Sequence, residues 1–263
     1  MHAADYRHVA ERGCRPPMKS LLESARLRRR LAVASVAVAG ALFAVPAALG
    51  CGTGGYSYAG LASPAHAFGI GATVTPLAGF DVLSGHVAGW VGVGGPRQGP
   101  NGADEWLQVG FSGFPALEGN DLYYELMLPN AQPTYHQLAS NLPTGKPARF
   151  GVLEMRDRPN WWRVWVNGSP ASDAILLPGS HARWSPMATA ESWDGGTAGT
   201  CNGFLYRFHN VSIARVPGGG WHQLLGGYTI GSPTTRLQQN ARTGSFLAAE
   251  GDVAFRTLAS FTP

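Results

Sequence analysis

The chain has 263 residues, of which 36 are glycine and 19 are proline, while only 14% are charged. Such a composition favours many short strands joined by turns, and the length suits one large all-β domain. The formal net charge is +4, yet residues 1–50 hold eight basic and three acidic residues, whereas residues 51–263 hold 12 basic and 13 acidic ones. The part of the chain after residue 50 is nearly neutral, which argues against a basic nucleic-acid-binding patch.

The first 50 residues predict an N-terminal extension that contains a signal peptide or a membrane anchor. A basic segment, Arg26–Arg30, precedes the apolar stretch Leu31–Leu49, and small residues such as Ala47 and Gly50 lie at the end of this stretch. These are the parts of a secretory signal, although an apolar stretch of about 20 residues is also long enough to stay in a bilayer as an anchor. We therefore expect a secreted or cell-surface protein that meets a membrane only through this segment, if it is not cleaved.

The cysteines suggest one disulfide and no metal site. Cys14 belongs to the N-terminal extension, so Cys51 and Cys201 remain as a pair. In an exported chain such a pair predicts a disulfide, and two unpaired thiols are the alternative. No Cys-x-x-Cys or His-Glu-x-x-His spacing occurs, and we expect neither a metal nor another cofactor.

In chain order, the pattern after residue 50 is that of short strands. Residues 51–65 are glycine-rich and predicted to be irregular, and no later window of helical length repeats its apolar residues every 3.6 positions. The sequence predicts an all-β fold, an antiparallel two-sheet β-sandwich of roughly ten to twelve strands over residues 51–221. Residues 222–263 are predicted to be a C-terminal extension in which 228–230 and 245–249 either add a hairpin to the edge of a sheet or cover that edge. The principal predicted strands are 69–77, 86–93, 105–111, 121–128, 135–138, 148–156, 161–166, 174–177, 183–193 and 204–215.

The strand Glu105–Phe111 turns two different faces to its surroundings. Leu107 and Phe111 would point to the core, while Gln108 would point away from it. Other predicted strands carry aromatic and polar residues on the same non-core side, and this composition predicts a substrate groove if the strands belong to one sheet. A second packed layer over the tryptophans is the alternative. The residues concerned are Trp90, Trp106, Gln108, Tyr123, Glu125, Trp161, Arg163, Trp165, Thr189, Glu191 and Trp193.

Four short blocks resemble those of the glutamic peptidases, the eqolisins. The blocks are Gly89–Gly94, Leu107–Gly110, Tyr124–Leu126 and Ala190–Trp193, the last followed by Phe204–Ala214. The resemblance implies a concanavalin A-like jelly roll with a concave groove, and it implies a catalytic pair made of Gln108 and Glu191. We expect the walls of the groove to bind substrate through Trp90, Trp106, Tyr123, Glu125, Trp165 and Trp193.

The two residue types of this pair suit peptide hydrolysis. A carboxylate can act as the general base on an attacking water and then as the acid for the leaving amine. A nearby amide can hold that water and donate an N–H to the oxyanion. The predicted function is that of an exported, acid-type, monomeric endopeptidase acting on polypeptides. Three alternatives stay open: a non-catalytic module that binds glycans on the tryptophan-lined face, a glycoside hydrolase that uses Glu125 and Glu191, and a surface interaction protein without catalysis.

Overall fold

A computed structural model describes residues 55–196, 202–258, 260, 261 and 263. The predicted leader and both cysteines of the predicted disulfide, Cys51 and Cys201, lie outside these residues. Within the described ranges, no helix is long and apolar enough to span a bilayer. The only α-helix described is α1 (Asp252–Leu258), and a single 3₁₀ turn, η1 (Pro100–Gly102), precedes one of the strands.

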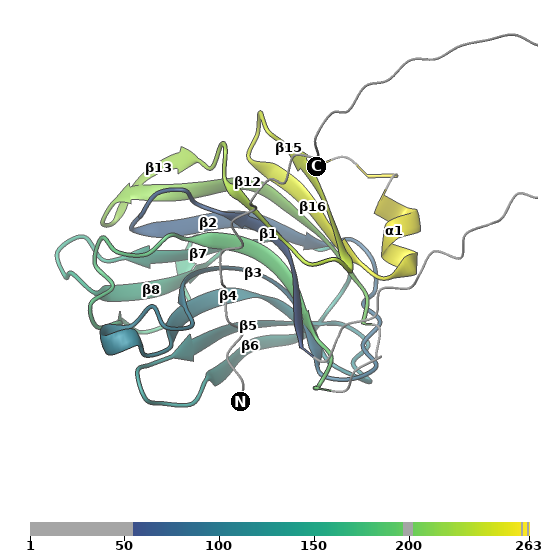
Figure 1. The fold of residues 1–263 in the computed structure, drawn as a ribbon, viewed down its shortest axis with the longest axis horizontal. Coiled ribbons are helices and arrows are strands. Elements are labelled where there is room, and N and C mark those ends of the chain that lie inside the picture. Colours follow the sequence, from purple (N-terminus) through teal and green to yellow (C-terminus); the bar gives the residue numbers. More distant parts are fainter. Residues whose placement is uncertain (1–54, 197–201, 259, 262) are drawn as a thin grey trace, which may run out of the picture. The chain divides into compact units, whose positions relative to one another are not determined.

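The strands form two sheets, and all their pairings are antiparallel (Figure 1). The seven-stranded sheet has the order β14 (Tyr228–Gly231), β1 (Tyr56–Ala62), β11 (Met187–Trp193), β3 (His86–Gly95), β4 (Glu105–Gly113), β5 (Asn120–Met127) and β6 (Thr134–Leu142). The nine-stranded sheet has the order β10 (Ile175–Leu176), β8 (Trp161–Val166), β7 (Ala148–Glu154), β2 (Gly69–Pro76), β12 (Phe204–Val216), β16 (Ser245–Glu250) and β15 (Thr235–Asn240). In addition, β13 (Gly219–Gln223) pairs with β12, and β9 (Ser169–Pro170) pairs with β8.

The core lies between the two sheets and is built by alternate residues of each strand. Val109 and Phe111 of β4 are buried, as are Phe150 and Val152 of β7 in the opposite sheet. The rings of Phe111 and Phe150 meet across the interface with their centroids 5.1 Å apart. Since side chains alternate between the two faces of a strand, the intervening residues point away from the core. The predicted all-β, antiparallel, two-sheet sandwich is confirmed.

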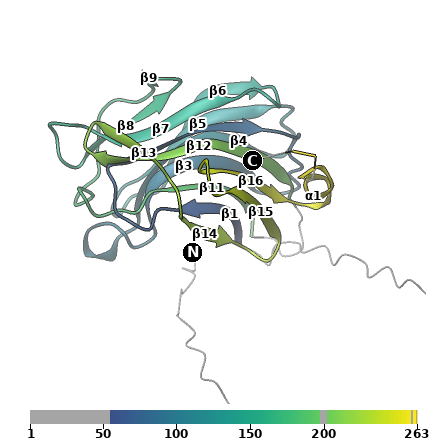
Figure 2. The ribbon, with the colours of Figure 1, turned by 90° about the horizontal axis from the view of Figure 1, so that it is seen from above.

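Two regions differ from the sequence-based expectation. Residues 56–62 are not irregular but form β1, in which the buried Ala59 and Leu61 face the core. The predicted edge hairpin does not form, because β14 pairs with β1 in one sheet whereas β16 pairs with β12 and β15 in the other (Figure 2). Glu250 of β16 accepts hydrogen bonds of 2.7 Å from Ser57 and from Thr234. Residues beyond 221 are therefore an integral part of the sandwich.

A buried carboxyl at the start of β4 gives the fold an unusual dependence on pH. Glu105 is fully buried, and neither of its carboxylate oxygens has a hydrogen-bond partner among the described residues. Burial raises the pKa of Glu105 from 4.5 to about 7. Between these values the folded chain holds a proton that the unfolded chain has lost, so the free energy of unfolding falls as the pH rises.

We expect Glu105→Gln to remove this slope, because glutamine is close to the protonated carboxyl in shape and stays neutral. At pH 8 the variant should be more stable than the wild type by about 1–3 kcal/mol, the usual cost of an unsatisfied buried polar group, and nearly equal to it at pH 4. Urea unfolding at the two pH values measures the difference. Glu118→Gln, at an exposed carboxylate, serves as the control. An equal stability gain at pH 4 and pH 8 would contradict the argument.

Candidate functional site

One face of the seven-stranded sheet gathers most of the predicted site residues. The outward side chains of β3, β4, β5 and β11 share this face, which we call the site face, because their neighbours in each strand are buried in the core. Gln108 comes from β4 and Glu191 from β11, and only β3 lies between these strands. The predicted residues on the site face are Trp90, Trp106, Gln108, Tyr123, Glu125, Glu191 and Trp193.

Gln108 is held by neighbours on both sides. Its Nε2 donates a hydrogen bond of 3.1 Å to the Tyr123 hydroxyl, and in the register of the sheet it lies opposite Gly92 and Glu125. A Cβ on Gly92 would lie 2.9 Å from the Gln108 Cβ and 3.1 Å from Cζ3 of Trp90, which shows that the Trp90 indole lies against this spot. The amide is thus fixed in position, while its second N–H and its carbonyl oxygen are left for other partners.

Glu191 and Gln108 both pair with β3, which lies between their strands. Glu191 lies opposite Ala88, and Gln108 lies opposite Gly92, which is four positions further along β3. Oε1 of Glu191 is 3.5 Å from Nε2 of His86, and the Glu191 side chain is 8% exposed. Burial raises the pKa of Tyr123 well above its ordinary value, and the charges of Glu191 and Glu125 raise it further. Tyr123 lies on β5 and accepts the hydrogen bond from Gln108. The charge of Glu191 on β11 therefore acts across the site face on the residue that holds Gln108 in place.

Glu125 is a second carboxylate on the site face. Its Oε1 accepts a hydrogen bond of 2.9 Å from the Trp106 indole. Burial raises the pKa of Glu125, the bond from Trp106 opposes this, and the nearby charge of Glu191 raises it again. As the pH falls, Glu125 therefore takes up a proton earlier than an ordinary glutamate does, and its repulsion of Glu191 disappears.

An unbroken series of ring contacts, the aromatic belt, crosses the site face beside the two carboxylates. Tyr56 stacks on Trp193 at 6.1 Å, and Trp193 meets His86 at 5.7 Å. Phe114 and Tyr135 continue the series, and Tyr135 stacks on Tyr123 at 4.9 Å. The belt consists of Tyr58, Tyr56, Trp193, His86, Phe114, Tyr135 and Tyr123.

Sequence reasoning missed most of the belt. Tyr56 and Tyr58 belong to the segment expected to be irregular, although their alternation with Ser57 and Ala59 was a strand signal. His86 opens a predicted strand, and its contact with Glu191 depends on the pairing of β3 with β11, strands that are about 100 residues apart in the sequence. No local pattern reports such a pairing.

Trp165 does not belong to the site face, contrary to the expectation. Together with Trp161 and Arg163 it lies on β8, which pairs with β7 in the nine-stranded sheet. The prediction assumed that all strands with outward tryptophans lie in one sheet. A sandwich has two outer faces with the same alternation pattern, and the sequence of one strand does not tell them apart.

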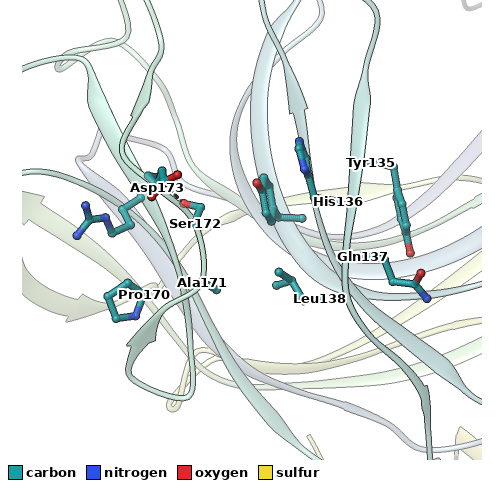
Figure 3. A pocket seen from close by; sticks show the side chains of 10 residues that line it. Tyr135, His136, Gln137, Leu138, Pro170, Ala171, Ser172 and Asp173 are labelled. Carbon is teal, nitrogen blue, oxygen red and sulfur yellow. Dashed lines mark hydrogen bonds between the residues drawn. The ribbon is translucent and has the colours of Figure 1, made fainter.

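A hollow lies between β6 and the segment 170–173, away from Gln108 and Glu191 (Figure 3). Its volume is about 870 Å³. It contains neither Gln108 nor Glu191, and it shares only Tyr135 with the aromatic belt. Within the described residues, no cluster of histidine, cysteine, aspartate or glutamate side chains could hold a metal ion. The lining residues are Tyr124, Tyr135, His136, Gln137, Leu138, Arg163, Pro170, Ala171, Ser172 and Asp173.

In sequence, no protein-family model and no curated protein matches the chain. In structure, it is similar to scytalido-glutamic peptidase bound to a peptide-based transition-state analogue, with a TM-score of 0.49, 15% identity, and coverage of 75% of this chain and 98% of that one. It is also similar to SCP-B, a member of the eqolisin family solved with the tripeptide Ala-Ile-His (TM-score 0.44, 13% identity, 75% and 98% covered). The carbohydrate-binding module CBM66 from Bacillus subtilis follows (TM-score 0.33, 12% identity, 60% and 80% covered). The chain is thus similar in its β-sandwich fold to glutamic peptidases and to a carbohydrate-binding module alike.

Proposed function

We propose that the protein is a peptidase that hydrolyses peptide bonds on the site face, with Glu191 as general base and acid and Gln108 as its amide partner. The observation that carries the proposal is the placement of a fixed amide, Gln108, on the same face as Glu191, whose charge reaches the tyrosine that holds this amide. A polypeptide lying across β3, along the aromatic belt, would meet both residues.

In this mechanism the Glu191 carboxylate removes a proton from a water that attacks the peptide carbonyl carbon. The free N–H of Gln108 donates to the oxyanion that forms, where electrostatic stabilisation matters most. Protonated Glu191 then gives its proton to the departing amine, which breaks the C–N bond. His86, next to Glu191, and Tyr123, next to Gln108, are positioning residues.

The basic and apolar composition of residues 26–49 supports export of the protein. A peptidase that acts outside the cytoplasm on unfolded polypeptide would use the aromatic belt as a set of shallow subsites, since flat rings accept many side chains at small cost.

The purified full chain is expected to hydrolyse denatured casein within the range from pH 2 to pH 7. A metal chelator and reagents that modify serine or cysteine nucleophiles should leave the rate unchanged, because the proposed reaction uses neither. Release of acid-soluble peptides measures the rate. A folded protein that releases no peptide at any of these pH values would refute the proposal.

The aromatic belt also favours one other function, the binding of glycans without catalysis, because flat rings stack on sugars as well as on peptides. Binding of neutral oligosaccharides that is lost in Trp193→Ala and retained in Glu191→Gln, together with inactivity on casein, would make that function the better account.

A further inference from the structure

The outer face of the nine-stranded sheet has a feature that the proposed peptidase does not use. Two tryptophans, Trp165 of β8 and Trp221 of β13, stand on this face on either side of two glycines, Gly151 of β7 and Gly71 of β2. The strands β8, β7, β2, β12 and β13 follow one another across the sheet (Figure 1). We call these four residues the glycine trough.

The trough has a floor without side chains and walls of indole. In the register of the sheet, Gly151 lies opposite both Gly71 and Trp165. Trp221 leans over Gly71, since a Cβ there would be 3.6 Å from its ring atoms Cζ3 and Cη2. A Cβ on Gly151 would meet only the Ile70 carbonyl oxygen and the Trp165 Cβ, both at 3.7 Å. A side chain added at Gly151 would therefore make ordinary van der Waals contacts only.

The width of the trough suits a sugar ring. Trp165 and Gly71 are separated by two strand spacings, which is on the order of 10 Å, and the Trp221 ring rises above Gly71. Trp221 is 41% exposed, and Trp165 is partly exposed. Trp161 differs from both, because the Arg158 guanidinium covers its ring at 3.9 Å.

The charged outward residues of the strands that carry the trough are basic, and Asp173, which lines the hollow together with Arg163, lies on the segment after β9 rather than on these strands. The outward residues of the described strands β2, β7 and β8 include Arg149 and Arg163 and no acidic residue. Neither arginine forms an ion pair with a described carboxylate, since the two ion pairs found in this part of the chain involve histidines. The opposite outer face of the sandwich carries Glu125 and Glu191. The two faces thus differ in sign, and an anionic ligand is matched to the face with the trough.

We propose that the glycine trough binds an acidic polysaccharide, with a sugar ring stacked between Trp165 and Trp221 and its carboxylate or sulfate groups close to Arg163 and Arg149. Sugar rings pack on indole faces through their C–H groups, and an open glycine floor lets the ring approach the sheet. This inference is independent of the proposed peptidase activity.

Electrophoresis of the full chain in native gels that contain polygalacturonate tests the proposal, with the fully methyl-esterified polymer as the uncharged counterpart. Dextran sulfate and dextran form a second pair, which distinguishes sulfate from carboxylate groups. We expect retardation by at least one of the charged polymers and by neither uncharged one. Trp221→Ala and Gly151→Val should each raise the dissociation constant roughly tenfold or more, through loss of stacking and filling of the floor.

The matched control is Trp161→Ala on the same strand and face as Trp165, which should bind like the wild type. Gly151→Val is expected to fold, because nothing lies closer than 3.7 Å to the added Cβ and valine favours strands. If Gly151→Val does not fold, Trp221→Ala decides the result, because Trp221 is exposed and its removal leaves the core intact. Absence of retardation, equal retardation by charged and uncharged polymers, or unchanged binding in both trough variants would each overturn the proposal.

Discussion

Glu191→Gln is expected to lower kcat for casein or peptide hydrolysis by roughly 10²–10⁴-fold, the usual contribution of a general acid–base residue. Glutamine keeps the shape of the side chain but can neither take the proton from the water nor return one to the amine. Because Glu191 contacts His86 at 3.5 Å and is not part of the apolar core, the variant should unfold at nearly the same temperature as the wild type. Initial rates and thermal unfolding, measured on the same preparations, separate the two effects.

Glu125→Gln is the decisive comparison. Glu125 lies directly opposite Gln108 in the sheet, so it is the other carboxylate on the site face that could act as general base in place of Glu191. This variant keeps the acceptor for the Trp106 indole and removes a charge that repels Glu191. We expect a change in rate of less than tenfold, with the acid side of the pH profile altered, since the raised pKa of Glu125 no longer contributes to it. A large loss in Glu125→Gln together with a small one in Glu191→Gln would reverse the assignment.

The reliable part of the sequence was the alternation within strands. Leu107 and Phe111 face the core as the pattern of β4 predicted. Asn167 and Gly168, a residue pair typical of two-residue hairpin turns, form the turn after β8 with φ angles of 51° and 82°. Both features are local, because side-chain direction alternates along one strand and a two-residue turn with positive φ requires residues that tolerate it.

Membership of a sheet could not be predicted in the same way. Trp165 and Trp106 have the same local pattern, yet they lie on the two opposite outer faces of the sandwich. The contacts of Glu191 with His86 and of Gln108 with Tyr123 arise from long-range strand pairing. The prediction of Gln108 and Glu191 depends on the resemblance of short sequence blocks to those of the glutamic peptidases. Alternation alone would not have distinguished them from other polar residues on exposed faces.

Gln108→Met is expected to lower kcat by roughly 10²–10³-fold, the usual effect of removing one donor to an oxyanion. Methionine is close to glutamine in length and volume, so it should fill the space beside Trp90 while lacking both the N–H and the carbonyl oxygen. KM should change little, because the amide acts on the developing oxyanion more than on the bound substrate. The Tyr123 hydroxyl loses its donor in this variant, and a decrease of about 1 kcal/mol in the free energy of unfolding is expected.

Tyr123→Phe separates the chemistry of Gln108 from its positioning. The amide remains, but the 3.1 Å bond that fixes it is lost, so kcat should fall by about tenfold or less, a much smaller loss than in Gln108→Met. Gln239→Met, at an exposed position on β15 of the other sheet, controls for the substitution itself. If Gln108→Met retains full kcat while Glu191→Gln does not, the amide has no part in the reaction, and a carboxylate acting without it would be the correct mechanism.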